Sequence, residues 1–187
     1  MSYLRERYPF RFYLPIAAAF TAAAFTGEMP QRWMHVILSW VTVVSMVFQF
    51  RLWDDLGDLA YDRIHHPDRV LCRAASVNCY AHAAGAIGLL NVALLVVLGR
   101  SYLAFVALSI AAVVWYGAVG VGVRRSVAGR HVTLLKYPAM VLLIAPARFP
   151  EPRTVLAAVL VYLSCAIYEV LHDNEIRTEP SARMIRA

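Results

Sequence analysis

Charged residues are scarce in this chain of 187 residues, where Asp, Glu, Lys and Arg together make up 16%. Soluble domains usually carry about 25% charged and about 45–50% apolar residues, whereas 60% of this chain is apolar. The apolar residues form long runs separated by short charged breaks, which is the pattern of a polytopic helical membrane protein. A soluble helical bundle would need polar faces at helical period, and most of these runs have none.

Cysteine is also rare. Cys72, Cys79 and Cys165 form neither a CxxC pair nor an even set, which argues against a metal site built on cysteine and says nothing about disulfides. Internal repeats and low-complexity tracts are missing too, so we expect one domain over residues 1–187. The basic start and the first apolar run resemble a signal peptide, but no small-x-small cleavage site follows, and we interpret this run as a first span.

The fold class that we expect is an all-α polytopic membrane protein with about six transmembrane helices. The fifth is the weakest of the six, because Lys136 lies near its start and Pro138 follows; Lys136 could snorkel to the interface. The expected spans lie near 12–26, 33–51, 77–98, 102–122, 132–147 and 154–172.

The loop charges predict the orientation. With six spans, 14 of the 18 basic residues share the side that holds both termini, so the positive-inside rule places that side in the cytoplasm. Ten of the 12 acidic residues lie on this side as well. We therefore expect an inner or cytoplasmic membrane protein with its termini and acidic motifs facing the cytoplasm. Topology accounts for most of the net charge of +6, so no nucleic-acid partner is required.

An acidic motif, "WDDLGDLAYDR", directly follows the second apolar run. If the helix continues through it, Asp54, Asp58 and Asp62 recur at i, i+4 and i+8, with Asp55 beside them, and one face presents three carboxylates. Like charges at this spacing repel one another. A divalent cation would reverse that effect, and Mg²⁺ prefers carboxylate oxygens and bridges to substrate phosphates. The motif therefore predicts a magnesium site completed by a phosphorylated ligand.

A second acidic pair, Glu169 and Asp173, lies at i and i+4 at the end of the sixth run, with Glu175 just beyond. The two acidic clusters could close on one anion from opposite sides, each through its own metal ions. A solvated charged loop is the alternative, but acids at the end of a membrane span favour a functional role. Basic residues on the same side could bind the anion directly: Arg51, Arg63, Arg69, Arg124, Arg125 and Lys136.

At these residues the chain resembles the UbiA superfamily of intramembrane prenyltransferases. That family carries N/D-D-x-x-D-x-x-x-D after its second span, often followed by R-x-x-x-P-x-R, and D-x-x-x-D after its sixth. Here Asp54–Arg63 matches the first signature, His65–Arg69 looks like the following segment, and Glu169–Asp173 is a looser match to the last, since Glu replaces Asp.

The resemblance implies a helical bundle around a central cavity open to lipid, with two or more Mg²⁺ ions holding an isoprenoid diphosphate. Asp54, Asp58, Asp62, Glu169 and Asp173 would then be catalytic metal ligands, with Asp55 beside them. The family also grips the diphosphate with a Tyr/Lys pair, for which Lys136 and Tyr137 are the nearest candidates. Aromatic side chains that could shelter the prenyl cation are Trp40, Phe48, Trp53, Trp115 and Tyr116.

The chain departs from the family in length, because the family has about nine spans and this chain ends just after the sixth. Either a second copy supplies the missing walls, as a homo-oligomer, or the pocket is smaller and more open. Three functions follow: a prenyltransferase that passes the prenyl group to an acceptor, a membrane terpene cyclase without an acceptor, and a non-catalytic membrane subunit or transporter. The last would show neither metal dependence nor pyrophosphate release.

Overall fold

The computed structural model describes residues 3–28, 30, 32–146 and 151–177, and it describes side chains as far as residue 171. Within these ranges all regular structure is helical, which confirms the predicted all-α class. The helices are α1 (Tyr3–Arg7), α2 (Phe10–Ala24), α3 (Trp33–Gly57), α4 (Leu59–His65), α5 (Asn78–Val97), α6 (Tyr102–Ala118), α7 (Val121–Arg124), α8 (Val127–Leu134), α9 (Lys136–Ile144) and α10 (Pro152–Arg177).

Four of the described helical segments are long and apolar enough to cross a membrane: α3, α5, α8 with α9, and α10. The other two apolar helices, α2 and α6, are shorter. An apolar helix therefore coincides with each predicted segment, and the helices indicate association with a membrane. The fifth segment differs in detail: it begins at Val127, and a turn at Leu135 divides it just before Lys136. Lys136 does not snorkel outward, since it is 6% exposed and faces the interior.

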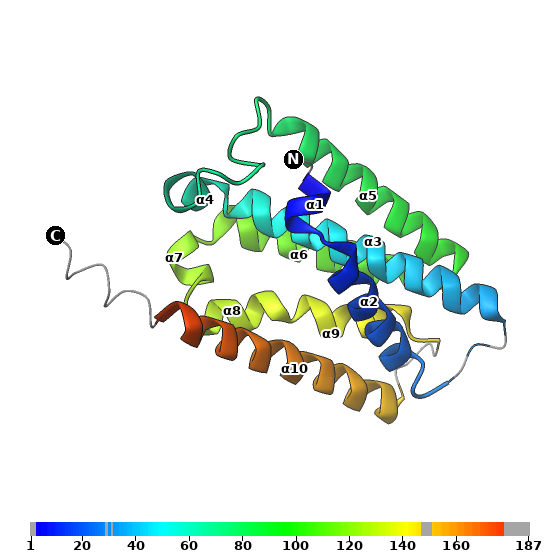
Figure 1. Ribbon diagram of the computed structural model, residues 1–187. Coiled ribbons are helices and arrows are strands. Elements are labelled where there is room, and N and C mark those ends of the chain that lie inside the picture. The colour runs from blue at the N-terminus through cyan, green and yellow to red at the C-terminus, as the bar shows by residue number, and fades with distance from the viewer. Residues whose placement is uncertain (1–2, 29, 31, 147–150, 178–187) are drawn as a thin grey trace.

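Helix α3 lies at the centre of the bundle and packs against α2, α5, α6 and α9, while α10 packs against α2 and α9 (Figure 1). Lipid tails are as apolar as these side chains, so close packing rather than removal from water would hold such a bundle in a membrane. The central cluster is built mainly by α2, α3 and α9: Ala17, Phe20, Ala24, Val43, Met46, Val47, Phe50, Met140, Val141 and Ile144.

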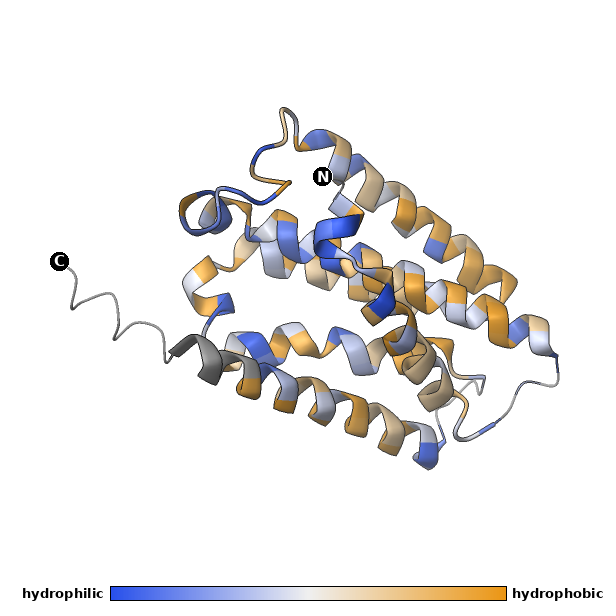
Figure 2. Ribbon diagram, in the orientation of Figure 1, coloured by the Kyte–Doolittle hydropathy of each residue, from blue (hydrophilic) through white to orange (hydrophobic). Residues whose placement is uncertain are grey.

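The outer surface of the bundle is apolar as well. On α10, Leu156, Leu160, Leu163 and Ile167 are all exposed, and apolar residues also follow the outer face of α5 (Figure 2). A soluble monomer rarely exposes contiguous apolar surface of this extent. The outer faces of α5 and α10 therefore suit contact with lipid.

The polar elements gather at one end of the bundle. Helix α4, helix α7 and the C-terminal end of α10 lie at the same end in Figure 1, and α1 packs against the C-terminal half of α3. The helix ends that carry the two predicted acidic motifs, those of α3 and α10, thus lie at one end of the fold.

Candidate functional site at the polar end of the bundle

The acidic motif straddles the junction of α3 and α4. Helix α3 ends at Gly57, Asp58 forms a turn, and α4 begins at Leu59. Backbone bonds from Asp58 N to Asp54 O (3.0 Å) and from Asp62 N to Asp58 O (2.9 Å) carry the helical spacing across this break. The predicted continuous helix is therefore interrupted at one residue, but the i, i+4, i+8 relation of the three aspartates survives.

Asp54 is held by two residues that are distant in the sequence. Nζ of Lys136 donates to both carboxylate oxygens, at 2.6 Å and 2.5 Å, and the Tyr116 hydroxyl donates to Oδ1. Lys136 is the first residue of α9, so the turn at Leu135 aims it at the end of α3. Tyr116, a candidate shelter for a cation on sequence grounds, orients a carboxylate in the structure.

Asp58 pairs with Arg124, whose Nη1 donates to Oδ1 at 2.8 Å. The same guanidinium also donates to the carbonyl oxygens of Gly57 (2.8 Å) and Val119 (3.1 Å), so three bonds hold it in place. Burial raises the pKa of the Asp58 carboxyl above its ordinary value, against the lowering influence of Arg124 and Arg125. A further cation beside this carboxyl would stabilise its charged form.

Two glycines permit the close approach of Arg124 to the end of α3. A Cβ at Gly57 would lie 2.9 Å from the Tyr116 ring and 3.2 Å from Nη1 of Arg124. A Cβ at Gly129, at the start of α8, would overlap the carbonyl oxygen of Val123. Glycine at both positions therefore lets α7 pack tightly on α8 and brings Arg124 against the end of α3.

Asp62 lies on α4, where it forms an ion pair with Arg69 from the following loop. The carboxylate is buried, and its Oδ1 has no hydrogen-bond partner among the described residues. A buried oxygen without a donor is costly, so it marks a place where a cation or donor would be stabilised.

Asp55 points away from the other three aspartates, toward α1. It is 4% exposed and accepts from Tyr3 Oη (2.7 Å) and from Nε (3.0 Å) and Nη2 (2.5 Å) of Arg7, while Arg51 Nη2 lies 3.5 Å away. Burial is the largest single influence on the pKa of Arg7 and lowers it, but the hydrogen bond to Asp55 and the charges of Asp55 and Tyr3 together raise the net pKa. In the structure Asp55 and Arg51 therefore anchor α1. The sequence predicts other roles for them, Asp55 in the metal site and Arg51 in the diphosphate site.

The remaining predicted residues are dispersed. Tyr137 packs against Phe20 in the core, with Lys136 Nζ 5.3 Å from its ring centre, and Arg63 is exposed on α4. Oε1 of Glu169, on α10, lies 3.9 Å from Nη1 of Arg130 on α8. The side chains of Asp173 and Glu175 lie outside the described part of the chain. The proposed closure of Glu169 and Asp173 on a shared anion thus stays a prediction.

Each of the four aspartates of the motif thus faces its own cation: Lys136, Arg7, Arg124 and Arg69 for Asp54, Asp55, Asp58 and Asp62. Among described residues, no three Asp, Glu, His or Cys side chains come close enough together to hold a metal ion. In this arrangement the three arginines and the lysine neutralise the four carboxylates. A ligand that carries both charges could rearrange these pairs without a large change in total charge.

No model of a known protein family matches the chain, and neither a curated protein nor a solved structure matches it. The resemblance to the UbiA superfamily therefore rests on the sequence signatures alone.

Proposed function

We propose that the chain is a six-span, Mg²⁺-dependent membrane prenyltransferase of UbiA type, which ionises an isoprenoid diphosphate and transfers the prenyl group to an acceptor. The observation that carries this proposal is the alternation of Asp54, Asp58 and Asp62 with Lys136, Arg124 and Arg69 at one end of an apolar bundle. A diphosphate with a long apolar tail needs this combination, because its head requires cations while its tail requires a dry surface.

The donor set suits Mg²⁺ in its chemistry. Asp62 offers a buried oxygen without a partner, and Asp58 is a partly exposed carboxylate whose pKa burial has raised. These two residues would hold the metal, and Asp54 would join them once Lys136 turns to the anion. When bound there, Mg²⁺ supplies charge neutralisation for the leaving diphosphate.

The residues of the chain itself would bind and orient the substrate. Arg124 and Arg69 suit bidentate contacts with phosphate oxygens, and Lys136 acts as a point charge. The bond between C1 of the prenyl chain and the diphosphate oxygen breaks, and its electron pair leaves with the diphosphate. The allylic cation then takes an electron pair from an acceptor, which loses a proton. In the cyclase alternative, a double bond of the same chain supplies the electron pair instead.

The test uses protein purified in lipid nanodiscs with geranyl, farnesyl and geranylgeranyl diphosphate and Mg²⁺. Pyrophosphate release is measured with and without aromatic acceptors, and the organic products are analysed. Prenylated acceptor supports the transferase, whereas hydrocarbon formed without acceptor supports the cyclase. A chain that releases no pyrophosphate from any of the three substrates would be the non-catalytic subunit or transporter.

Asp58→Asn should lower pyrophosphate release by roughly a thousandfold, because it removes a carboxylate that contacts the reacting complex. The fold should survive, since Arg124 keeps its bonds to the carbonyl oxygens of Gly57 and Val119. Asp68→Asn is the matched control, because Asp68 is an exposed acid in the loop after α4. Equal activity in the two variants would contradict the assignment of Asp58.

Glu169→Gln separates a structural from a functional role for the second acidic cluster. The contact with Arg130 is long and partly exposed, and such pairs stabilise a fold by about 0–1 kcal/mol. We expect an unchanged melting temperature and a rate of pyrophosphate release that is lower by about tenfold or more. The Mg²⁺ concentration at half-maximal rate should rise, and it is measured by titrating Mg²⁺ in the same assay. An unchanged Mg²⁺ dependence would remove Glu169 from the site.

A further inference from the structure

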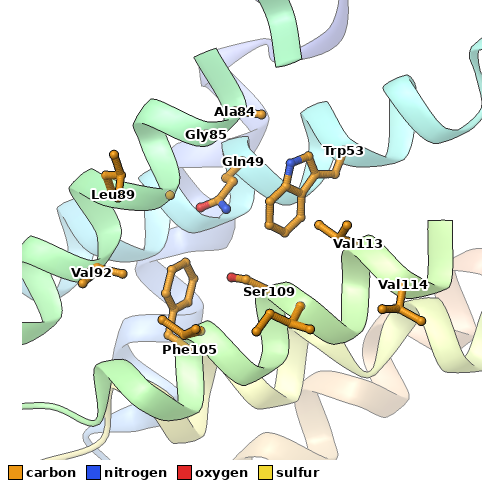
Figure 3. A pocket seen from close by; sticks show the side chains of 13 residues that line it. Gln49, Trp53, Ala84, Gly85, Leu89, Val92, Phe105, Ser109, Val113 and Val114 are labelled. Atoms are coloured by element: carbon orange, nitrogen blue, oxygen red, sulfur yellow. The ribbon is translucent and has the colours of Figure 1, made fainter. Parts of the chain in front are cut away.

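A second candidate site lies away from the aspartates, between α3, α5 and α6. It is a pocket of about 310 Å³ whose lining is almost entirely apolar (Figure 3). Helix α5 makes room for it with three small residues on one face, Ala84, Gly85 and Gly88. A Cβ at Gly85 would meet no atom within 4 Å, and one at Gly88 would lie 3.1 Å from Nε2 of Gln49.

The pocket contains an unsatisfied polar spot. Gln49 is 1% exposed; its Oε1 accepts from Nδ2 of Asn91 at 2.7 Å, while its Nε2 donates to none of the described residues. Oγ of Ser109, on the opposite wall, is buried and has no partner there either. Both side chains appear among the apolar residues of Figure 3. Oδ1 of Asn91, beside Gln49, is also buried without a partner among the described residues. An amide N–H that faces such a pocket without an acceptor is costly, because the hydrocarbon of a membrane provides none.

The lining of the pocket limits the charge of its occupant. Gln49 lies eight residues, or about 12 Å, before the end of α3 and two residues before Arg51. None of the lining residues is charged, which excludes a diphosphate. The occupant is therefore neutral. It is largely apolar and carries one oxygen atom that can accept a hydrogen bond from Nε2 of Gln49.

The volume and the walls limit its size. An apolar cavity of about 150 Å³ holds one benzene ring, so a pocket of roughly twice that volume suits two rings. The aromatic side chains of Trp53 and Phe105 line the pocket on either side of Gln49 (Figure 3). Aromatic walls favour planar rings through stacked or edge contacts.

We propose that this pocket binds a neutral molecule of about two-ring size, whose carbonyl oxygen accepts a hydrogen bond from Nε2 of Gln49. The Ser109 hydroxyl provides a second donor to the same oxygen. The site is separate from the aspartate cluster and does not depend on the proposed diphosphate chemistry.

Benzophenone is a suitable probe, because it has two rings and one carbonyl, and light makes that carbonyl attack nearby C–H bonds. The chain in nanodiscs is irradiated with benzophenone, and peptide mass spectrometry locates the adducts. We expect them on wall residues such as Leu89, Val92 and Val113. Excess fluorenone should compete about tenfold better than fluorene, which has the same rings without the carbonyl, since one hydrogen bond to a buried amide has about that effect.

Gly85→Leu should reduce the labelling of these walls at least tenfold, because the new side chain fills the pocket. Gly117→Leu is the matched control: it also adds a side chain into open space, but it lies outside the lining. The double variant Gln49→Leu/Asn91→Leu removes both amides together, so neither amide is left without the other, and it should reduce the preference for fluorenone to what the Ser109 hydroxyl alone provides. Labelling that is unaffected by Gly85→Leu, or equal competition by fluorene, would overturn the proposal.

Discussion

Replacing Lys136 by methionine is expected to lower the melting temperature by roughly 5–10 °C and to abolish pyrophosphate release. The cause is the Asp54 carboxylate, which would retain only the Tyr116 hydroxyl as a donor in a partly buried place. Breaking a buried ion pair by removing one partner costs about 3–5 kcal/mol, and the 18% exposure of the Asp54 side chain reduces this to about 2–3 kcal/mol. For a chain of this length, 1 kcal/mol corresponds to about 2–4 °C.

Two further variants separate stability from activity at this pair. Lys136→Met combined with Asp54→Asn leaves no unpaired charge, so the melting temperature should return to within about 2 °C of the parent. Pyrophosphate release should stay at background, since both a metal ligand and a diphosphate cation are missing. Lys136→Arg keeps the charge and should retain stability. If the double variant recovered activity together with stability, Lys136 and Asp54 would be a structural pair only.

The sequence predicted the helices well because their signal is local. Apolar runs of the length of α3, α5 and α10 have few alternatives in a membrane, and each polar break marks an end. The ends of α3 and α10, which carry the two acidic motifs, lie at one end of the bundle. The exception was the segment around Lys136, where a lysine and a proline weakened the signal although the structure forms α8 and α9 there.

The ion pairs of the site could not be predicted in the same way. Asp54 meets Tyr116 and Lys136 across 62 and 82 positions, and no spacing rule in a single sequence connects residues so far apart. A lysine early in a span can snorkel outward, because that avoids burying its charge. In the structure the buried charge is instead compensated by Asp54, and only the packing of α9 against α3 reveals this.

Asp55 shows the limit of pattern matching most clearly. It sits inside the acidic signature, and the signature made it a metal ligand, but one residue along a helix turns a side chain by about 100°. That rotation directs Asp55 to Tyr3 and Arg7 on α1, which no motif had singled out. Helix α1 has a second attachment, because Glu6 accepts from the backbone N–H of Val70 at 3.1 Å and 3.3 Å.

Asp55→Asn should therefore destabilise the fold by about 2–3 kcal/mol and release α1, without changing the affinity for Mg²⁺. The variant removes the counter-charge of Arg7 and Arg51, which then face each other with no carboxylate between them. Limited proteolysis should cleave the N-terminus at least tenfold faster than in the parent. Arg5→Gln is the control, since Arg5 is an exposed cation on the same helix.

The dependence of pyrophosphate release on Mg²⁺ distinguishes the anchor from a metal ligand. If Asp55 is an anchor, the concentration of Mg²⁺ at half-maximal rate should be the same for the folded fraction of Asp55→Asn and for the parent. A ligand to the metal would instead raise this concentration by tenfold or more, as Asp62→Asn is expected to do. If both results are obtained, Asp55 fastens the N-terminal helix, and Asp62 offers the metal an oxygen that has no hydrogen-bond partner among the described residues.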